Sequence, residues 1–400
     1  MSAPAHRSQA RSPADAIAPG QWLGLLGGGQ LGRMFCMAAQ SLGYHVAVID
    51  PAEASPAGSV ADLHLRADYL ASAALERMAT LCRAATTEFE NVPATALDFL
   101  ARNLRVTPAA TSVAIAQDRI SEKTFLSGHG FAVTPFAVLR DDADVAKAPA
   151  TLLPGIVKSA RLGYDGKGQV RVGTRDELAA AFAALGRRPC VLERLIDLSC
   201  EISVVVARCD DGHAVSWPVA ENLHRDGILD VSIVPARVAP ALTVRAEEIA
   251  TSIAAALDYR GVLCVEMFVA MDGALMVNEI APRPHNSGHY TIDACVTSQF
   301  EQQARILAGQ PPGATLQHTP AVMVNLLGDL WLDSGGRVRE PAWERVLAHP
   351  ACKLHLYGKP EPRRGRKMGH VTCLGATLDD ALDAARAIKR ALAIPGADAL

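Results

Sequence analysis

The sequence carries no excess of charge of either sign. Its 39 lysine and arginine residues nearly balance its 42 aspartate and glutamate residues, which gives a formal net charge of −3. Nucleic acids and anionic membrane surfaces attract proteins through a basic field, and this chain has none. No apolar run reaches the length of a membrane-spanning helix. We therefore expect no nucleic-acid partner and no membrane partner.

The 9 cysteines form no CxxC pair and show no other metal-ligand spacing. Such cysteines are typical of buried, reduced thiols in a cytoplasmic protein. Residues 1–20 lack the apolar core of a signal peptide, and we expect them to form a disordered tail. With 400 residues, half of them hydrophobic, the chain is long enough for two or three domains. The expected location is the cytoplasm.

The first hundred residues have the strand–helix–strand order of a parallel sheet. The apolar strand Trp22–Leu26 runs into the glycine-rich segment 27–32 (GGGQLG), and a second strand, His45–Ile49, ends at Asp50. This order predicts a Rossmann-like domain. The glycines fit GxGxxG, so an NAD-dependent oxidoreductase is one hypothesis. A site for a simple phosphate and a tight turn without a ligand are the alternatives.

Two acids of the segment TEFENV, Glu88 and Glu90, lie at the C-terminal end of a further expected strand, Ala85–Phe89. Ligands of open α/β sheets bind at such carboxyl ends of strands. The alternative is an acid at the start of the next helix. A later helix, expected at Asp118–Ser127, has charged residues on one side and should turn Phe125 and Leu126 inward.

A glycine-rich segment joins two expected strands in the middle of the chain. Ile156-Val157-Lys158 is apolar and ends in a cation, and Val170-Arg171-Val172 follows the segment 159–169. A Walker loop would run into a helix instead. Lys158 on its strand and Lys167 on a mobile flap could grip a polyphosphate from two sides, as phosphoryl transfer requires. A plain glycine-rich hairpin is the alternative.

Two apolar runs, Val262–Ala270 and Leu275–Ile280, flank Asp272-Gly273 and predict a hairpin with a two-residue turn. In that register Glu266 lies directly opposite Glu279. Two carboxylates about 5 Å apart repel by roughly 3 kcal/mol at an effective dielectric constant near 20. The pair therefore predicts a cation between them, such as Mg2+ holding phosphate oxygens. A solvated hairpin face is the alternative.

Three other polar features have weaker patterns. Glu201 begins a mostly apolar and therefore buried strand, where a carboxylate needs a specific partner. His224 is expected in a polar loop. Near the C-terminus, two short strands flank the basic segment Gly358–His370, which by itself is more often a solvated loop.

Together, the lysine-ended strand, the glycine flap, the acid-headed strand and the two-carboxylate hairpin resemble the ATP-grasp superfamily. Within it, six segments between Gln21 and about Leu392 resemble, in order, the 5-(carboxyamino)imidazole ribonucleotide synthetases of purine biosynthesis. They are GGGQLGRM, TEFENV, GYDGKGQ, AENLHRDGIL, NEIAPRPHNSGH and YGKPEPRRGRKMGH.

The resemblance implies where ATP binds. Arg119 and Lys158 meet the phosphates, and the flap closes over them. The segment 193–196 presents its backbone to adenine, and an acid meets the ribose with a histidine nearby. The implied residues are Arg119, Lys158, Gly163, Tyr164, Asp165, Gly166, Lys167, Gly168, Gln169, Glu193, Arg194, Leu195, Ile196, Glu201, His224, Asn278 and Glu279.

The resemblance also implies Mg2+ (or Mn2+) held by Glu266 and Glu279. Many ATP-grasp enzymes carry an asparagine two residues after the second glutamate, but here that residue is Ala281, so only two protein ligands are implied. The implied contacts of aminoimidazole ribonucleotide are Gln30, Glu88, Tyr164, Asp165, Lys359 and Arg366, the last two at its 5′-phosphate. The implied catalytic residues are Arg283, His285, Asn286 and Lys167, of which the first three receive bicarbonate or carboxyphosphate.

The implied fold is α/β, with a Rossmann-like parallel-sheet domain at 21–110, a two-lobed ATP-grasp domain at 111–312 and a small β-rich domain at 318–395. The implied reaction is the ATP- and bicarbonate-dependent carboxylation of the exocyclic amine of 5-aminoimidazole ribonucleotide, by a homodimer. One alternative is a formate-dependent glycinamide ribonucleotide transformylase. Others are the NAD-dependent oxidoreductase and a non-catalytic nucleotide sensor, which would lack Arg283 and His285.

Overall fold

The computed structural model of the protein describes residues 16–161, 163 and 168–400. Four flap residues named above, Tyr164, Asp165, Gly166 and Lys167, lie outside the described residues. Residues 16–20 fall within the tail that we expected to be disordered, but they pack on the fold. The backbone N–H of Ile17 donates to Ala308 O at 2.7 Å, and Tyr44 Oη donates to Ile17 O at 2.8 Å.

The N-terminal region is a parallel sheet with the strand order β3-β2-β1-β4-β5. Its central strands are almost wholly buried, because helices cover both faces of the sheet. The strands are β1 (Trp22–Leu26), β2 (His45–Ile49), β3 (Leu63–Leu65), β4 (Ala84–Thr87) and β5 (Arg105–Val106). The helices are α1 (Gln30–Ser41), α2 (Ser72–Leu81), α3 (Ala94–Ala101) and α4 (Ala110–Ala116). The expected Rossmann-like arrangement is confirmed.

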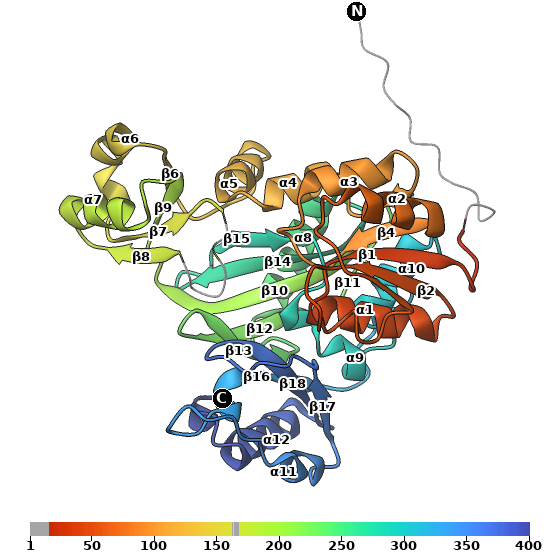
Figure 1. Ribbon diagram of the computed structural model, residues 1–400. Coiled ribbons are helices and arrows are strands. Elements are labelled where there is room, and N and C mark those ends of the chain that lie inside the picture. Colours follow the sequence, from red (N-terminus) through yellow and green to blue (C-terminus); the bar gives the residue numbers. More distant parts are fainter. Residues whose placement is uncertain (1–15, 162, 164–167) are drawn as a thin grey trace, which may run out of the picture.

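A smaller lobe follows, at the left of Figure 1, after α5 (Arg119–Gly128). It is an antiparallel sheet in the order β6-β9-β7-β8, covered by two helices. Its elements are β6 (Phe136–Leu139), α6 (Asp142–Lys147), β7 (Gly155–Ser159), β8 (Gln169–Val172), α7 (Arg175–Ala184) and β9 (Cys190–Arg194). The hydroxyl of Thr174 caps α7 by accepting from the N–H of Glu177.

The second lobe is built on a larger antiparallel sheet. Helix α8 packs on one face of it, and α10 lies on the other face, between this sheet and the N-terminal domain. Its strands are β10 (Leu198–Arg208), β11 (Ala214–Ser216), β12 (Ala220–Arg225), β13 (Ile228–Val234), β14 (Gly261–Ala270) and β15 (Leu275–Ala281). Its helices are α8 (Pro240–Ala256), α9 (Thr291–Ala294) and α10 (Gln299–Leu307).

The C-terminal strands continue this same sheet. β16 (Ala321–Leu327) pairs with β13, then β18 (Lys367–Leu374) with β16, and β17 (Cys352–Leu356) with β18. Within the described residues, the path therefore runs β15-β14-β10-β12-β13-β16-β18-β17 without a break. Helices α11 (Trp343–Leu347) and α12 (Leu378–Ala391) pack on these strands.

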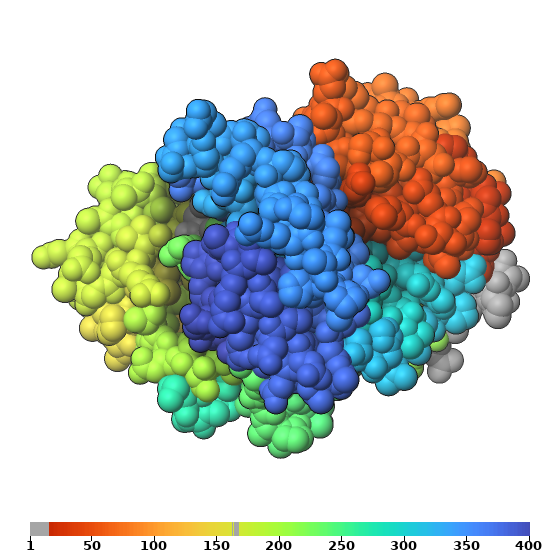
Figure 2. All heavy atoms as spheres, turned by 90° about the horizontal axis from the view of Figure 1, so that it is seen from below, coloured from red at the N-terminus to blue at the C-terminus, as the bar shows by residue number. Residues whose placement is uncertain are grey.

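Figure 2 shows the face on which the three regions meet. The C-terminal residues occupy its middle, with the N-terminal domain on one side and the smaller lobe on the other. The expected three-part α/β fold is thus confirmed, with the C-terminal part joined to the second lobe by a shared sheet. No helix among the described residues is long and apolar enough to span a bilayer.

Candidate functional site

The hairpin β14–β15 places Glu266 directly opposite Glu279, as the sequence predicts. The turn differs from the expected two-residue turn. The N–H of Ala270 donates to Ala274 O at 2.9 Å, which encloses three residues, and the last of them, Gly273, has φ +83°. Three-residue hairpin turns commonly end in such a left-handed residue.

A second irregularity restores the register. The longer turn shifts the pairing by one residue, so that Met267 faces Val277. A β-bulge at Asn278 then inserts one extra residue into β15, and beyond it Glu266 and Glu279 face each other again. The predicted pair is therefore correct, although the predicted turn is wrong.

Each carboxylate of this pair has its own cationic partner. Arg119 Nη1 lies 2.9 Å from Glu279 Oε2, and His285 Nε2 lies 2.9 Å from Glu266 Oε1. Burial disfavours both charged forms of the second pair, but neighbouring charges outweigh it. His285 lowers the pKa of Glu266, and Cys264 and Glu266 raise the pKa of His285. Arg119 and His285 therefore already reduce the repulsion between Glu266 and Glu279, and these two carboxylates do not by themselves require a bound metal ion.

The oxygen atoms here nevertheless fit a hard divalent cation. The two ion pairs engage one oxygen of each glutamate, and Asn278 Oδ1 is buried without a hydrogen-bond partner among the described residues. Mg2+ prefers carboxylate and carbonyl oxygens. Glu266 and Glu279 are the residues that would hold it, and the donor set suits that ion.

A buried charge cluster lies next to the hairpin. Lys158 Nζ on β7 is 2.9 Å from Glu193 Oε2, and Lys123 Nζ on α5 is 3.2 Å from Glu193 Oε1. Burial raises the pKa of Glu193, but the two lysines outweigh it and lower the pKa below its usual range. Lys158, predicted at the ATP phosphates, therefore stands at the end of a fixed network.

Helix α5 differs from the expected pattern of buried and exposed residues. Its buried residues include Leu126, as expected, but also the charged Glu122 and Lys123, whereas Phe125 is only half-buried. Glu122 Oε1 accepts from the N–H of Ile280 on β15 at 2.5 Å. Burial, and then Glu279, raise the pKa of Glu122 to about 8. The helix thus contributes charged groups to the site, and sequence reasoning missed Glu122 and Lys123.

The segment expected to present its backbone to adenine begins inside β9. Glu193 pairs within the sheet, and the N–H groups of Arg194 and Leu195 donate to Pro135 O and Pro154 O, both at 2.9 Å. Leu195 is 39% exposed where the chain passes through Ile196 into the second lobe. The lobe itself already uses these two donors, so they are not available to a base.

The expected pair of Glu201 and His224 does meet. His224 Nδ1 lies 3.1 Å from Glu201 Oε2. Burial lowers the pKa of His224, but Glu201 outweighs it and raises the pKa. The expectation that His224 lies in a polar loop is wrong, because it lies in β12, and the turn to β13 follows at Asp226-Gly227, both with positive φ.

The flap is described only at its two ends. Lys158 pairs with Gln169 across β7 and β8, and the N–H of Ser159 donates to Gly168 O at 2.8 Å. Gly163, Gly168 and Gln169 are the expected flap residues that the structure describes. The segment therefore begins and ends on paired strands, as expected of a strand-to-strand loop.

The glycine-rich loop before α1 is filled by the chain's own carboxylates. The N–H of Gly28 donates to Asp50 Oδ2 at 2.8 Å, and the N–H groups of Gly29 and Gly32 donate to the two Glu88 oxygens at 2.6 and 2.9 Å. A Cβ on Gly29 would stand 2.5 Å from Glu88 Oε1. A pyrophosphate would have to displace both acids, so the oxidoreductase hypothesis loses its binding site.

This arrangement places Glu88 beside residues from the other domains. Burial raises the pKa of Glu88, against the lowering effects of its amide bonds and of Arg283 and Lys359. Gln30, the other residue expected here, is the first residue of α1. Gln30, Glu88, Lys359 and Arg283 are thus brought to one region from three parts of the sequence.

Arg283 is held by an acid that sequence reasoning did not assign. Its Nε forms a short ion pair with Glu90 Oε2, and its Nη1 donates to Pro284 O at 3.1 Å. Burial lowers the pKa of Arg283, but Glu90 outweighs it and the pKa is raised. The sequence pattern does place Glu90, with Glu88, at a ligand-binding strand end, but it does not predict the pairing of Glu90 with Arg283.

His285 and Asn286 differ in how available they are. His285 Nδ1 lies 2.9 Å from Ser287 Oγ, and His285 joins Glu266 through its other nitrogen. Asn286 is buried, and its side-chain amide exchanges two hydrogen bonds with that of Asn325, at 3.0 and 2.6 Å. These bonds use one N–H and one oxygen lone pair of the amide, which leaves its second N–H and the other lone pair for a further partner.

The two residues expected at a 5′-phosphate lie at the ends of the basic segment after β17. Lys359 Nζ donates to Lys367 O at 2.6 Å and lies 5.6 Å from the centre of the Tyr357 ring. Arg366 Nη1 donates to Glu361 O at 2.7 Å, and Arg366 is half-buried. Burial and Arg363 lower the pKa of Arg366.

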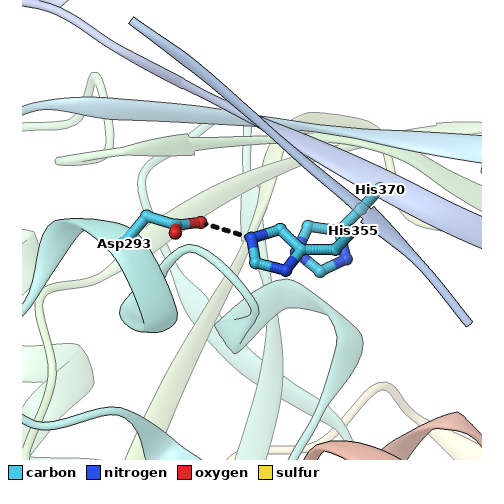
Figure 3. A group of neighbouring side chains, drawn as sticks. All are labelled: Asp293, His355 and His370. Carbon is cyan, nitrogen blue, oxygen red and sulfur yellow. Dashed lines mark hydrogen bonds and ion pairs between the residues drawn. The ribbon is translucent and has the colours of Figure 1, made fainter. Parts of the chain in front are cut away.

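A cluster of ionisable side chains joins the C-terminal strands to α9 (Figure 3). His355 Nε2 lies 2.8 Å from Asp293 Oδ2, and His355 stacks on His370 with ring centres 4.5 Å apart and planes within 11°. The stack arises because these histidines are directly opposite in the β17–β18 ladder. The lone pairs of parallel imidazoles do not converge on one point, so we assign no metal to this cluster.

Comparisons with known proteins cover almost the whole described chain. Family models match the ribonucleotide synthetase preATP-grasp domain at residues 21–117 and the ATP-grasp domain at 124–300. A third matches the phosphoribosylaminoimidazole carboxylase C-terminal domain at 321–384. The N5-carboxyaminoimidazole ribonucleotide synthase of Brucella melitensis is 44% identical over 89% of this chain and 97% of its own length. That of Bacillus subtilis is 41% identical, over 91% and 94%.

Solved structures agree with these relatives. N5-carboxyaminoimidazole synthetase from Staphylococcus aureus, complexed with ADP, has a TM-score of 0.86 at 36% identity and covers 94% of this chain and 98% of that one. The Aspergillus clavatus enzyme in complex with ADP and 5-aminoimidazole ribonucleotide has a TM-score of 0.85 at 32% identity, with 95% and 99% covered. The chain therefore belongs to the N5-carboxyaminoimidazole ribonucleotide synthase family of ATP-grasp ligases.

Proposed function

We propose that the chain uses ATP and bicarbonate to carboxylate the exocyclic amine of 5-aminoimidazole ribonucleotide, as an ATP-grasp carbon–nitrogen ligase of purine biosynthesis. One observation carries the proposal. The end of β15 and the segment that follows it run from Glu279, which pairs with Arg119, to Arg283 and His285, which pair with Glu90 and Glu266. A single stretch of chain thus links a phosphate-binding side to an acceptor side.

The chemistry suits these groups. Bicarbonate is a poor electrophile, so it must first take the γ-phosphoryl group of ATP. Lys158 and Arg119 would offset the charge of the transferring group, and Mg2+ bound by Glu266 and Glu279 would supply further charge neutralisation. The resulting carboxyphosphate would release CO2 to the attacking amine, leaving ADP and phosphate. A flap that excludes water would protect such a hydrolysable intermediate.

Arg283 and His285 are the proposed catalytic groups at the acceptor. A guanidinium can hold a planar carboxylate-like anion through two parallel hydrogen bonds, which an ammonium cannot do. Cys264 and Glu266 raise the pKa of His285 against the effect of burial, and a protonated ring would hold an anion or donate a proton before it could accept one. Lys167 from the flap and Asn286 stay predictions.

The proposal is tested by ADP release with 5-aminoimidazole ribonucleotide, bicarbonate and Mg-ATP, each omitted in turn. We expect ADP to form at the full rate only when all are present, because the acceptor completes the site. A rate that ignores the ribonucleotide but responds to formate and glycinamide ribonucleotide would replace the proposal with the transformylase alternative. EDTA should abolish turnover, and Mg2+ or Mn2+ should restore it.

Glu90→Gln should lower kcat/KM for bicarbonate by about 10- to 100-fold, because a misplaced catalytic group costs that much even where its charge is kept. The KM for ATP should stay within about twofold, since Glu90 contacts Arg283 and not the phosphate side. Initial rates at varied bicarbonate measure both values. Glu53→Gln, which removes an exposed ion pair with Arg66 in the same domain, is the matched control. An equal change in the KM for ATP and the KM for bicarbonate would contradict a role of Glu90 that is specific to Arg283.

The oligomeric state, the cellular location and the domain boundaries are also proposals. We infer a homodimer and a cytoplasmic location from the family resemblance, and we keep the division at 21–110, 111–312 and 318–395 as a proposed domain organisation. Size-exclusion chromatography with light scattering measures the first of these directly, and a monomer at micromolar concentration would contradict it.

A further inference from the structure

Two cysteines meet across the last two strands of the long sheet. Cys352 begins β17 and Cys373 lies near the end of β18, and the ladder places them directly opposite each other. Their sulfur atoms are 3.5 Å apart. All 9 cysteines are described as free thiols, and among them no other sulfur–sulfur contact is found.

The hydrogen bonds of the ladder show which type of pair this is. The N–H of Leu374 donates to Ala351 O, and the N–H of Tyr357 donates to Met368 O, both at 2.9 Å. Hydrogen-bonded and non-hydrogen-bonded pairs alternate along antiparallel strands, so the Cys352–Cys373 pair is a non-hydrogen-bonded one. In such pairs the Cα atoms are about 4.5 Å apart and the side chains approach closely, within the range that a disulfide spans.

The surroundings of the pair favour a reaction between these two thiols over reactions of either one alone. Both sulfurs belong to the core between the strands and helices α11 and α12, and Cys373 is 0% exposed. Cys352 is 8% exposed and lies on the edge strand of the sheet, where a small oxidant can approach. The hydrogen bond between the two sulfurs lowers the pKa of Cys352, whereas burial raises the pKa of Cys36 and Cys295 to about 12.

We propose that Cys352 and Cys373 are a reversible thiol–disulfide site, oxidised by small hydroperoxides. The Cys352 thiolate attacks one oxygen of hydrogen peroxide, the O–O bond breaks, and a sulfenic acid and water result. The Cys373 sulfur then attacks the sulfenic sulfur and displaces a second water, which forms the S–S bond. The balance is two thiols and one hydrogen peroxide to one disulfide and two waters, and a dithiol reverses it.

A disulfide between Cys352 and Cys373 would constrain β17 and β18, the strands next to one side of the proposed acceptor site. Closing the sulfurs from 3.5 Å to about 2.0 Å ties edge strand β17 to β18 at the end of the ladder remote from Tyr357 and Lys359. Lys359 follows β17, and Lys367 begins β18. The inference goes beyond the proposed function and does not depend on it, since it needs no substrate.

The test is thiol counting and peptide mapping of the reduced full-length protein before and after hydrogen peroxide. After denaturation we expect the count to fall from 9 thiols by two, and we expect one peptide pair, containing positions 352 and 373, to weigh about 2 Da less than its free form. Dithiothreitol should restore both. In Cys352→Ser and Cys373→Ser the linked pair should be absent, while Cys209→Ser, at a half-buried unpaired cysteine, should retain it.

Two outcomes would overturn the proposal. One is full alkylation of Cys352 and Cys373 after peroxide, while the more accessible Cys200 and Cys209 are oxidised. The other is a linked peptide that forms only between two molecules, as a dependence on protein concentration would reveal. Differential alkylation of the wild-type chain gives either answer without a variant, so a serine variant that fails to fold leaves the test intact.

Discussion

Replacing Glu279 by Gln is expected to lower ATP turnover by about 10²- to 10³-fold, the usual cost of losing one electrostatic contact to a transition state. Glu279 stands opposite Glu266, pairs with Arg119, and is one of the two residues that would hold Mg2+. An amide keeps the shape but removes the charge that a hard cation prefers. The measurement is ADP release at saturating substrates over a Mg2+ titration, where the variant should also need more Mg2+.

The fold should survive this change, because Glu279 is only half-buried and an amide can still accept from Arg119. Circular dichroism and thermal unfolding check that point. Glu76→Gln, at an exposed position on α2, is the matched control and should match the wild type. Wild-type turnover in the Glu279 variant, with an unchanged Mg2+ requirement, would remove the metal assignment from the hairpin.

Replacing Glu193 by Leu should cost about 3–5 kcal/mol of unfolding free energy, the usual penalty for breaking a buried ion pair from one side. Glu193 is 2% exposed and is the carboxylate between Lys123 and Lys158, so its loss leaves two buried cations without their partner. The midpoint of the first urea transition of the substrate-free protein measures the change. Because the chain has several domains, that transition and not a global value is the quantity to compare.

The control for this variant is Asp142→Asn on α6 of the same lobe. Asp142 pairs with Arg187, but the two side chains are 73% and 62% exposed, and such pairs contribute about 0–1 kcal/mol. We expect no measurable shift of the urea midpoint. If the two variants shift it equally, the network around Glu193 does not stabilise the lobe in the way its burial indicates.

The β14–β15 hairpin shows which features of the site can be predicted from the sequence and which cannot. Alternation of side chains and an assumed two-residue Asp-Gly turn predict that Glu266 and Glu279 face each other, and this pairing is correct only because two irregularities cancel. The same reasoning could not foresee a three-residue turn and a bulge at Asn278, which shift the register in opposite directions. The position of a β-bulge depends on the residues that pack around the strand, and the sequence of the strand alone does not contain that information.

Partners far apart in the sequence were the main omissions. Glu90 and Arg283 are separated by 193 positions in the sequence. Lys123 lies on α5, whereas its partner Glu193 lies on β9 of the smaller lobe. A helix pattern assigns charged residues to the solvent side by default, so Glu122 and Lys123 on α5 were not recognised. His224 was misplaced because polar residues at the end of a chain segment are read as loop, whereas His224 lies in β12 and pairs with Glu201.

The pairing of β13 with β16 limits where the protein can be divided into fragments. Family models separate the regions at residues 300 and 321, yet hydrogen bonds between β13 and β16 cross that boundary. A fragment ending before β16 would present β13 as a long, unpaired apolar edge, and the isolated remainder would present β16 in the same way. Such fragments are prone to associate with one another, so the two regions should be expressed, exchanged or grafted together as one piece.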